Sequence, residues 1–134
     1  MSQYAGRNEV IDVITQSIAA IEGTDQLVCV ISGKILRTKD LYFELGYEHG
    51  DKILAEICTT ISDCLRDQDF FARLDNNDFT IVLPGLKNTG QPLMATNKIQ
   101  RNCGTVEIGK RGLKVKFAFG ASMSSIDSDQ PETL

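Results

Sequence analysis

Hydrophobic residues recur at helical spacing in two parts of the chain. Between Gly50 and Arg66 they form a stripe about 100° wide, which is typical of a helix packed on a core. Near the N-terminus, isoleucines share one face of a predicted helix that begins at Asn8 as its N-cap, runs to about Ile21 and stops at Gly23. The apolar positions behind these predictions are Ile11, Ile14, Ile18 and Ile21, and then Ile53, Leu54, Ile57, Cys58, Ile61 and Leu65.

Three apolar runs predict strands in the middle of the chain. The first, Leu27–Ile31, is continuous, so we expect a central strand covered on both faces. The other two, Phe70–Leu74 and Phe79–Leu83, flank the polar cluster Asp75–Asp78. Because Asn and Asp tolerate positive φ and hydrogen-bond their own backbone, this pattern predicts a β-hairpin whose second strand ends at Pro84–Gly85.

The remaining elements are shorter. Pro92 opens a predicted helix, Gly109–Gly112 joins the strands of a second hairpin, and the polar chain from Ser122 onward is expected to fray. The predicted ranges are a short helix at Leu41–Leu45, a helix at Gln91–Arg101 and strands at Thr105–Ile108 and Leu113–Phe119. This order of elements predicts the α+β class, with a mostly antiparallel sheet covered by helices and a ferredoxin-like core.

Composition narrows the class of protein. With 134 residues, 42% hydrophobic content and a net charge of −4, the chain is predicted to be a single soluble domain over residues 1–134. The acidic balance argues against nucleic acid as a partner. There is no apolar run of membrane-spanning length and no visible signal peptide, so we expect a cytoplasmic protein without direct membrane contact. The four cysteines lack a metal-binding spacing and are predicted to be free thiols.

The sequence ARLDNNDFTIVLP resembles the signature hairpin of the GGDEF family, the bacterial diguanylate cyclase domains. In this register Arg73 matches the family's Arg and Phe79 its final Phe. The sequence GYEHGD, from Gly46 to Asp51, resembles the family's GHxxGD motif, and AGRN and FAFGAS resemble its first and last motifs. The positions of Gly, Gly, Asp or Glu, and Glu in the signature are occupied by Asp75, Asn76, Asn77 and Asp78.

The resemblance implies a nucleotidyl-cyclase-like GGDEF fold in cyclic di-GMP signalling. It implies an activity that joins two GTP molecules, with Mg²⁺ held by carboxylates from the end of the first strand and from the third signature position. Those positions carry Lys34, Leu36 and Asn77 here, and the guanine-reading pair is replaced by Tyr42 and Phe43. We therefore predict no catalytic residues, no metal site and no cofactor, with GTP bound weakly or not at all and Mg²⁺ entering only with residual GTP.

Arg66 and Asp69 match the family's RxxD motif ahead of the signature. The resemblance implies an inhibitory site, where the Arg binds phosphate and guanine of cyclic di-GMP and the Asp accepts from a guanine edge. Lys98, or Asn97 on an ungapped count, lies near the position where members of the family often carry a secondary Arg of that site. The alternative interpretation is a helix C-terminal Arg with surface acids that bind nothing.

Three functions remain open at this stage. The first is a catalytically inactive regulatory domain that binds cyclic di-GMP or acts in dimerisation, including as a homodimer. The second is an active diguanylate cyclase. The third is a ferredoxin-like module of another class, such as an RNA-binding sheet, which the acidic pI argues against. The resemblance also implies a last helix that is absent here, so we expect a C-terminally truncated domain of a larger protein with an attached EAL or sensory domain.

Overall fold

The computed structural model describes residues 6–108 and 111–124. The helices are α1 (Arg7–Ala20), α2 (Thr38–Leu45), α3 (Tyr47–Asp63) and α4 (Gln91–Cys103). The strands are β1 (Leu27–Ile35), β2 (Phe70–Arg73), β3 (Asp78–Leu86), β4 (Thr105–Ile108), β5 (Arg111–Lys114) and β6 (Phe117–Ser124). Of the helices within this part of the chain, none is both long and apolar enough to cross a membrane.

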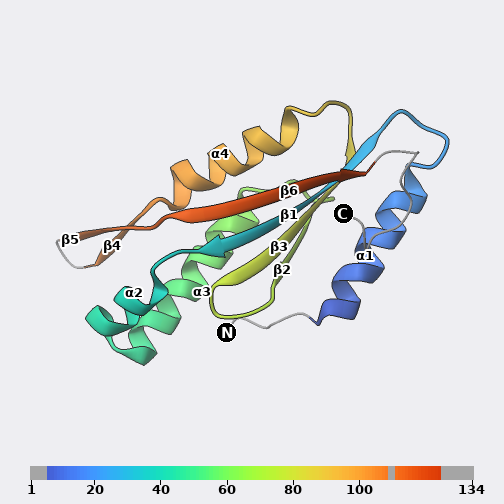
Figure 1. Ribbon diagram of the computed structural model, residues 1–134. Helices are drawn as coiled ribbons and strands as arrows, with labels where there is room; N and C mark the ends of the chain where they lie inside the picture. Colours follow the sequence, from blue (N-terminus) through green and yellow to red (C-terminus); the bar gives the residue numbers. More distant parts are fainter. Residues whose placement is uncertain (1–5, 109–110, 125–134) are drawn as a thin grey trace.

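Four strands form one antiparallel sheet in the order β2-β3-β1-β6, and β4 and β5 form a separate antiparallel pair (Figure 1). Helix α1 packs against one side of the large sheet, whereas α3 and α4 pack against the other. This arrangement confirms the predicted α+β class and the antiparallel sheet covered by helices.

Strand β1 contributes to a hydrophobic core on each side of the sheet. Cys29, Ile31 and Ile35 pack with α3 and α4, whereas Val28 packs with α1. Neighbouring residues of a strand point to opposite faces, so a strand between two helical layers needs apolar residues at both parities. The prediction of a central strand covered on both faces is confirmed.

Helix α3 buries the apolar stripe that predicted it, but its ends differ from the prediction. It begins at Tyr47 rather than Gly50, because Gly46, with φ of +83°, separates it from α2. Gly50 instead lies inside the helix against the Tyr42 ring. The helix ends at Asp63, before Arg66, because the chain turns there and the backbone N–H of Asp69 donates to the carbonyl of Arg66 (3.0 Å).

Strands β1 and β3 are both longer than predicted. β1 continues past Ile31 to Ile35, because β3 and β6 pair with it along this length. β3 does not end at Pro84–Gly85 but continues to Leu86, which pairs with Leu27. A register irregularity follows Leu27 on β1, and such irregularities are places where a sheet accommodates proline.

The predicted single strand Leu113–Phe119 is two strands, β5 and β6, separated at Val115 and Lys116. The backbone N–H of Val115 donates to the carbonyl of Gly104 (2.9 Å), and the side-chain amide of Gln100 donates to the carbonyl of Val115 (3.1 Å). These bonds draw the chain toward the end of α4 and interrupt the ladder.

The remaining differences concern element ends. Gly6, not Asn8, occupies the N-cap position of α1, and no side chain caps the helix. Ser122–Ser124 pair with Val28–Val30 instead of fraying, and α4 extends to Cys103. The rest of the predicted polar tail and the Gly109–Lys110 part of the second turn lie outside the described residues.

Candidate functional site

The hairpin between β2 and β3 closes at the polar cluster that predicted it. The backbone N–H groups of Leu74 and Asp75 both donate to the carbonyl of Asp78, at 2.8 and 3.2 Å. The Asp75 carboxylate accepts from the backbone N–H of Asn76 (2.6 Å), as is typical of Asp in turns. The Asn77 carbonyl accepts from the N–H of Ile35 (2.7 Å), which ties the tip to the end of β1.

Arg73, which matches the family's Arg, lies buried beneath this tip. The residue is 4% exposed, and its guanidinium donates to the carbonyls of Asp75 (3.2 Å) and Asn76 (3.0 Å). Phe79 is 1% exposed and packs its ring with Phe71, Phe117 and Phe119. The two signature positions that this chain retains therefore hold the hairpin in place.

The residues around the tip do not fit Mg²⁺. Asn77 offers one neutral carbonyl oxygen, and Lys34 stands directly opposite Asp78 in the β1–β3 ladder. A positively charged residue at the position opposite Asp78 opposes the binding of a divalent cation. Leu36 contributes no metal ligand, and within residues 6–108 and 111–124 no three His, Cys, Asp or Glu side chains come together as a metal site.

Aromatic side chains occupy the guanine-reading positions. Tyr42 stacks on Tyr47 with ring centroids 5.2 Å apart, and its hydroxyl donates to the Asp51 carboxylate (2.8 Å). Burial first, and then this bond to Asp51, raise the pKa of the Tyr42 hydroxyl above its ordinary value. Phe43 is 93% exposed. Neither side chain offers the amide and carboxylate that a guanine edge requires.

The RxxD residues form a compact turn between α3 and β2. Asp69, whose side chain is 3% exposed, accepts from Nε of Arg66 (3.1 Å to each oxygen), from its Nη2 (2.7 Å) and from its backbone N–H (2.8 Å). Nη2 of Arg66 also donates to the carbonyl of Pro84 (2.9 Å). Asp69 therefore fixes the guanidinium of Arg66, which remains 37% exposed.

A pocket of about 260 Å³ brings the predicted site residues together. Arg66 and Asp69 line it from the turn and Lys98 lines it from α4, whereas Asn97 does not. Arg101, which the sequence interpretation missed, lies on the same wall. Its spacing of three residues from Lys98 places both on one helix face, and that spacing was the signal available in the sequence.

The whole chain, residues 1–134, matches the family model for the diguanylate cyclase GGDEF domain. A search of curated proteins finds no significant match. Among solved structures, the GGDEF domain of YfiN, also called TpbB, from Pseudomonas aeruginosa is 19% identical, with a TM-score of 0.86 over 98% of this chain and 83% of that one. An EAL/GGDEF domain protein from M. capsulatus is 26% identical, with a TM-score of 0.70 over 97% and 84%.

The GGDEF domain of DgcB from Caulobacter crescentus, solved in complex with c-di-GMP, is 14% identical, with a TM-score of 0.82 over 98% of this chain and 79% of that one. At these identities the structural similarity of YfiN and DgcB bears on the fold alone. The family model adds the sequence pattern of the whole chain to that fold. On this ground, the chain belongs to the GGDEF family of diguanylate cyclase domains.

Proposed function

We propose that this GGDEF domain is catalytically silent and acts as a regulatory domain that binds cyclic di-GMP beside Arg66, Asp69 and Lys98. The observation that carries the proposal is that these residues, together with Arg101, line one pocket although they come from separate segments. Three cationic side chains around a concave surface suit a ligand with two phosphates. The complex of the DgcB domain with c-di-GMP supports this choice of ligand.

The hydrogen bonds of the turn suggest a division of roles. Nε and Nη2 of Arg66 donate to Asp69 and Pro84. Nη1 is therefore the guanidinium nitrogen that we assign to ligand binding. Lys98 is exposed and adds a second positive charge. In this arrangement Asp69 positions Arg66. A guanine edge would reach the Asp69 carboxylate only after the Arg66–Asp69 ion pair separates.

The proposal that this domain lacks catalytic activity rests on the hairpin tip. Asp75 and Asn76 fill the space that two glycines would leave for a triphosphate, and Asp75 adds repulsion to a polyanion. Lys34 and Leu36 supply no carboxylate at the end of β1. Without carboxylates to hold a metal ion, the charge of the transition state is less stabilised. The activation free energy then rises by several kcal/mol, which slows the reaction about a thousandfold.

Calorimetric titration of the chain with cyclic di-GMP tests the binding. We expect micromolar affinity, and we expect Lys98→Gln and Arg66→Ala each to weaken it by about tenfold or more, because hydrogen bonds to charged groups contribute about 1.5–3 kcal/mol. The matched control is Lys52→Gln, which removes the charge of an exposed lysine on α3 outside the pocket and should leave the affinity unchanged.

Circular dichroism identifies any variant that fails to fold. Lys98 is exposed on α4, so its substitution keeps the test valid even if Arg66→Ala destabilises the turn. Absence of heat with folded wild-type protein would contradict the binding proposal and leave dimerisation as the regulatory role. Binding that neither substitution weakens would place the ligand elsewhere.

A further inference from the structure

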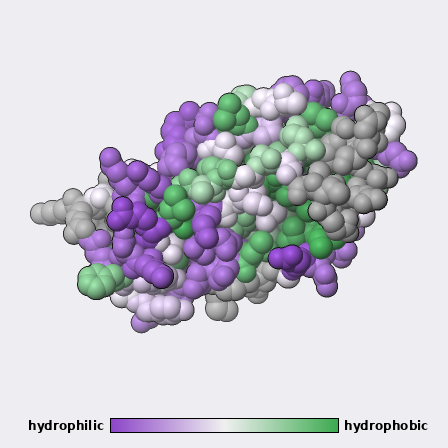
Figure 2. Space-filling model, in the orientation of Figure 1, coloured by the Kyte–Doolittle hydropathy of each residue, from purple (hydrophilic) through white to green (hydrophobic). Residues whose placement is uncertain are grey.

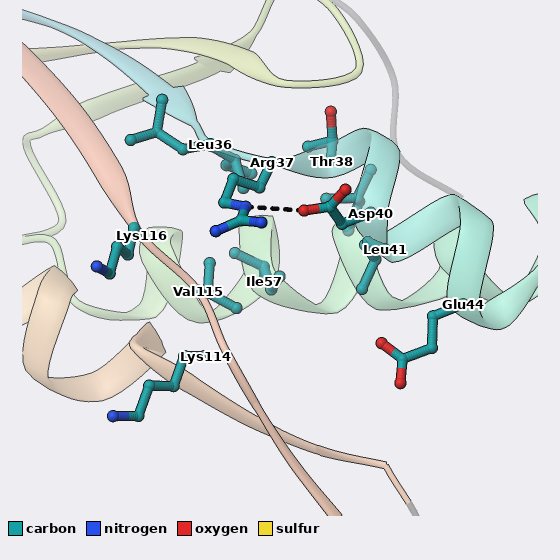
Figure 3. A pocket seen from close by; sticks show the side chains of 12 residues that line it. Leu36, Arg37, Thr38, Asp40, Leu41, Glu44, Ile57, Lys114, Val115 and Lys116 are labelled. Carbon is teal, nitrogen blue, oxygen red and sulfur yellow. Dashed lines mark hydrogen bonds and ion pairs between the residues drawn. The ribbon is translucent and has the colours of Figure 1, made fainter.

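A second pocket lies at the other end of the molecule and has no part in the proposed function. It has a volume of about 410 Å³ and lies between α2, α3 and the junction of β5 and β6 (Figure 3). Small-molecule sites typically have volumes of about 300–1,000 Å³. The Arg66 pocket is lined by a different set of residues, so the two sites are separate.

The floor of this pocket is apolar and belongs to the main hydrophobic core. Buried side chains from three elements and from the β5–β6 junction reach it, and none is more than 5% exposed. Such a floor favours an apolar ligand body. The residues are Ile35, Leu41, Leu54, Ile57 and Val115.

The backbone fixes the wall formed by the break between β5 and β6. The N–H of Leu36 donates to the carbonyl of Lys116 (2.8 Å), and the N–H of Val115 donates to the carbonyl of Gly104 (2.9 Å). Gln100 holds the carbonyl of Val115 (3.1 Å). The interruption that separates these strands therefore produces a preformed wall.

Arg37 stands at the mouth of the pocket in an unusual conformation. Among the described residues it is the one non-glycine residue with positive φ, at 61°. Such strained backbone conformations are concentrated at functional sites. Figure 3 shows its guanidinium between Leu36 and Val115, with Nε bonded to Asp40 (2.7 Å). Its terminal nitrogens make no hydrogen bond that we identify within the described part of the chain.

Further charges flank the mouth unevenly. Lys114 and Lys116 lie on the β-strand side, whereas Glu44 lies on the opposite side with α2 (Figure 3). Figure 2 shows hydrophilic surface gathered around this end of the molecule with apolar surface beside it. Within the described residues neither lysine takes part in an ion pair. The charge of Arg37 is balanced by Asp40, so the two lysines provide positive charge on one rim.

We propose that this pocket is a binding site for a small organic anion with an apolar body, with the body on the floor that includes Ile57 and Val115 and the acid group near Lys114, Lys116 and the terminal nitrogens of Arg37. The apolar floor accounts for the body, and the cationic rim accounts for the acid group. Because the lysines are exposed, salt weakens their contribution.

Fluorescence titration with anilinonaphthalene sulfonate tests the site. Phenylnaphthylamine, which has the same body without the sulfonate, is the matched probe. We expect one sulfonate molecule per chain, bound about fivefold more tightly than the neutral probe, with the preference lost at high salt. The Lys114→Gln/Lys116→Gln variant should remove this preference, whereas Lys52→Gln/Lys87→Gln, with the same charge change elsewhere, should keep it.

A second variant tests the cavity itself. Thr38 lines the pocket at the start of α2, and Thr38→Phe adds a ring to it. This variant should bind neither probe while keeping the wild-type circular dichroism spectrum. Bound probe should also raise the thermal midpoint, because a ligand of the native state stabilises it. Unchanged binding in folded Thr38→Phe, or an anion preference unaffected by loss of both lysines, would overturn the proposal.

Discussion

Arg66–Asp69 and Arg37–Asp40 are ion pairs with the same sequence spacing and the same shortest distance of 2.7 Å. They differ in burial, since the Asp69 side chain is 3% exposed and the Asp40 side chain is 62% exposed. Exposed pairs contribute little to stability because water screens the charges, whereas a buried carboxylate depends on its partner. Burial gives the two pairs different roles.

Asp69→Ala should therefore destabilise the protein more than Asp40→Ala. We expect a loss of about 1–3 kcal/mol in the free energy of unfolding for Asp69→Ala, because Arg66 loses its partner and the turn loses its backbone cap. For Asp40→Ala we expect about 0–1 kcal/mol. Urea unfolding of the two variants measures the difference, and equal losses would contradict this account.

Cys29 predicts an alkaline limit to stability. Burial raises the pKa of this thiol to about 11 in the folded protein. The folded state then holds the proton more tightly than the unfolded chain, so this contribution is complete below about pH 9 and is lost as the pH rises through about 11. The free energy of unfolding should fall less steeply over this range in Cys29→Ala, and an unchanged slope would count against this role of Cys29.

At the residue scale, Arg66 and Asp69 could be singled out from the sequence because a motif names both side chains. The position of Arg101 in the same pocket could not be singled out, because it depends on how α4 packs near the turn. The strain at Arg37 was equally hidden, since its sequence context gives no glycine or asparagine to indicate positive φ.

At the scale of elements, β1 and β3 meet with almost no clearance at Gly33. This residue pairs with Phe79, and a Cβ atom at position 33 would collide with the Phe79 ring. Gly33→Ala should lower the free energy of unfolding by about 1–3 kcal/mol, because overpacking displaces the ring. Gly120→Ala on β6 is the matched control, since a Cβ there meets nothing within 4 Å.

A double-mutant cycle locates the cause. Phe79→Leu should recover part of the loss in the Gly33→Ala background, because a smaller side chain leaves space for the new methyl group. Additive losses in the two single variants would contradict a direct contact between these residues.

The types and order of the elements were predictable because periodicity and turn residues are local signals. Boundaries failed where a distant segment decides them. The strand after Gly112 breaks because Gln100 and Gly104 bond Val115. The continuation of β3 past Pro84–Gly85 depends on its pairing with β1. None of these partners lies within the window that the local pattern covers.

At the scale of the whole molecule, we expect the substituted signature residues and the substituted residues at the end of β1 to prevent catalysis together. We expect no cyclic di-GMP from GTP and Mg²⁺ in a preparation free of other cyclases. Restoring the hairpin alone, by Asp75→Gly, Asn76→Gly and Asn77→Asp, should not restore turnover, because Lys34 and Leu36 still supply no carboxylate. Chromatography of the products measures this, and turnover by the wild-type chain would refute the proposal that this domain lacks catalytic activity.

The overall architecture was also accessible from sequence, since the family resemblance covers most of the chain and the family model matches all of it. The two pockets were not. Each is formed by side chains from separate elements, and the pocket beside Arg37 exists only because the chain leaves the ladder at Val115.

The contact between Gly33 and Phe79 has a consequence for how such a domain evolves. The hairpin is held by Phe79, the last residue of the signature, and by Arg73 beneath its tip. The side chains of the residues between these two are therefore not needed to keep the hairpin in place. Selection for folding and selection for chemistry therefore act on different positions of the same motif. A lineage that no longer depends on the reaction can substitute the residues needed for chemistry one by one and still keep the fold of the hairpin.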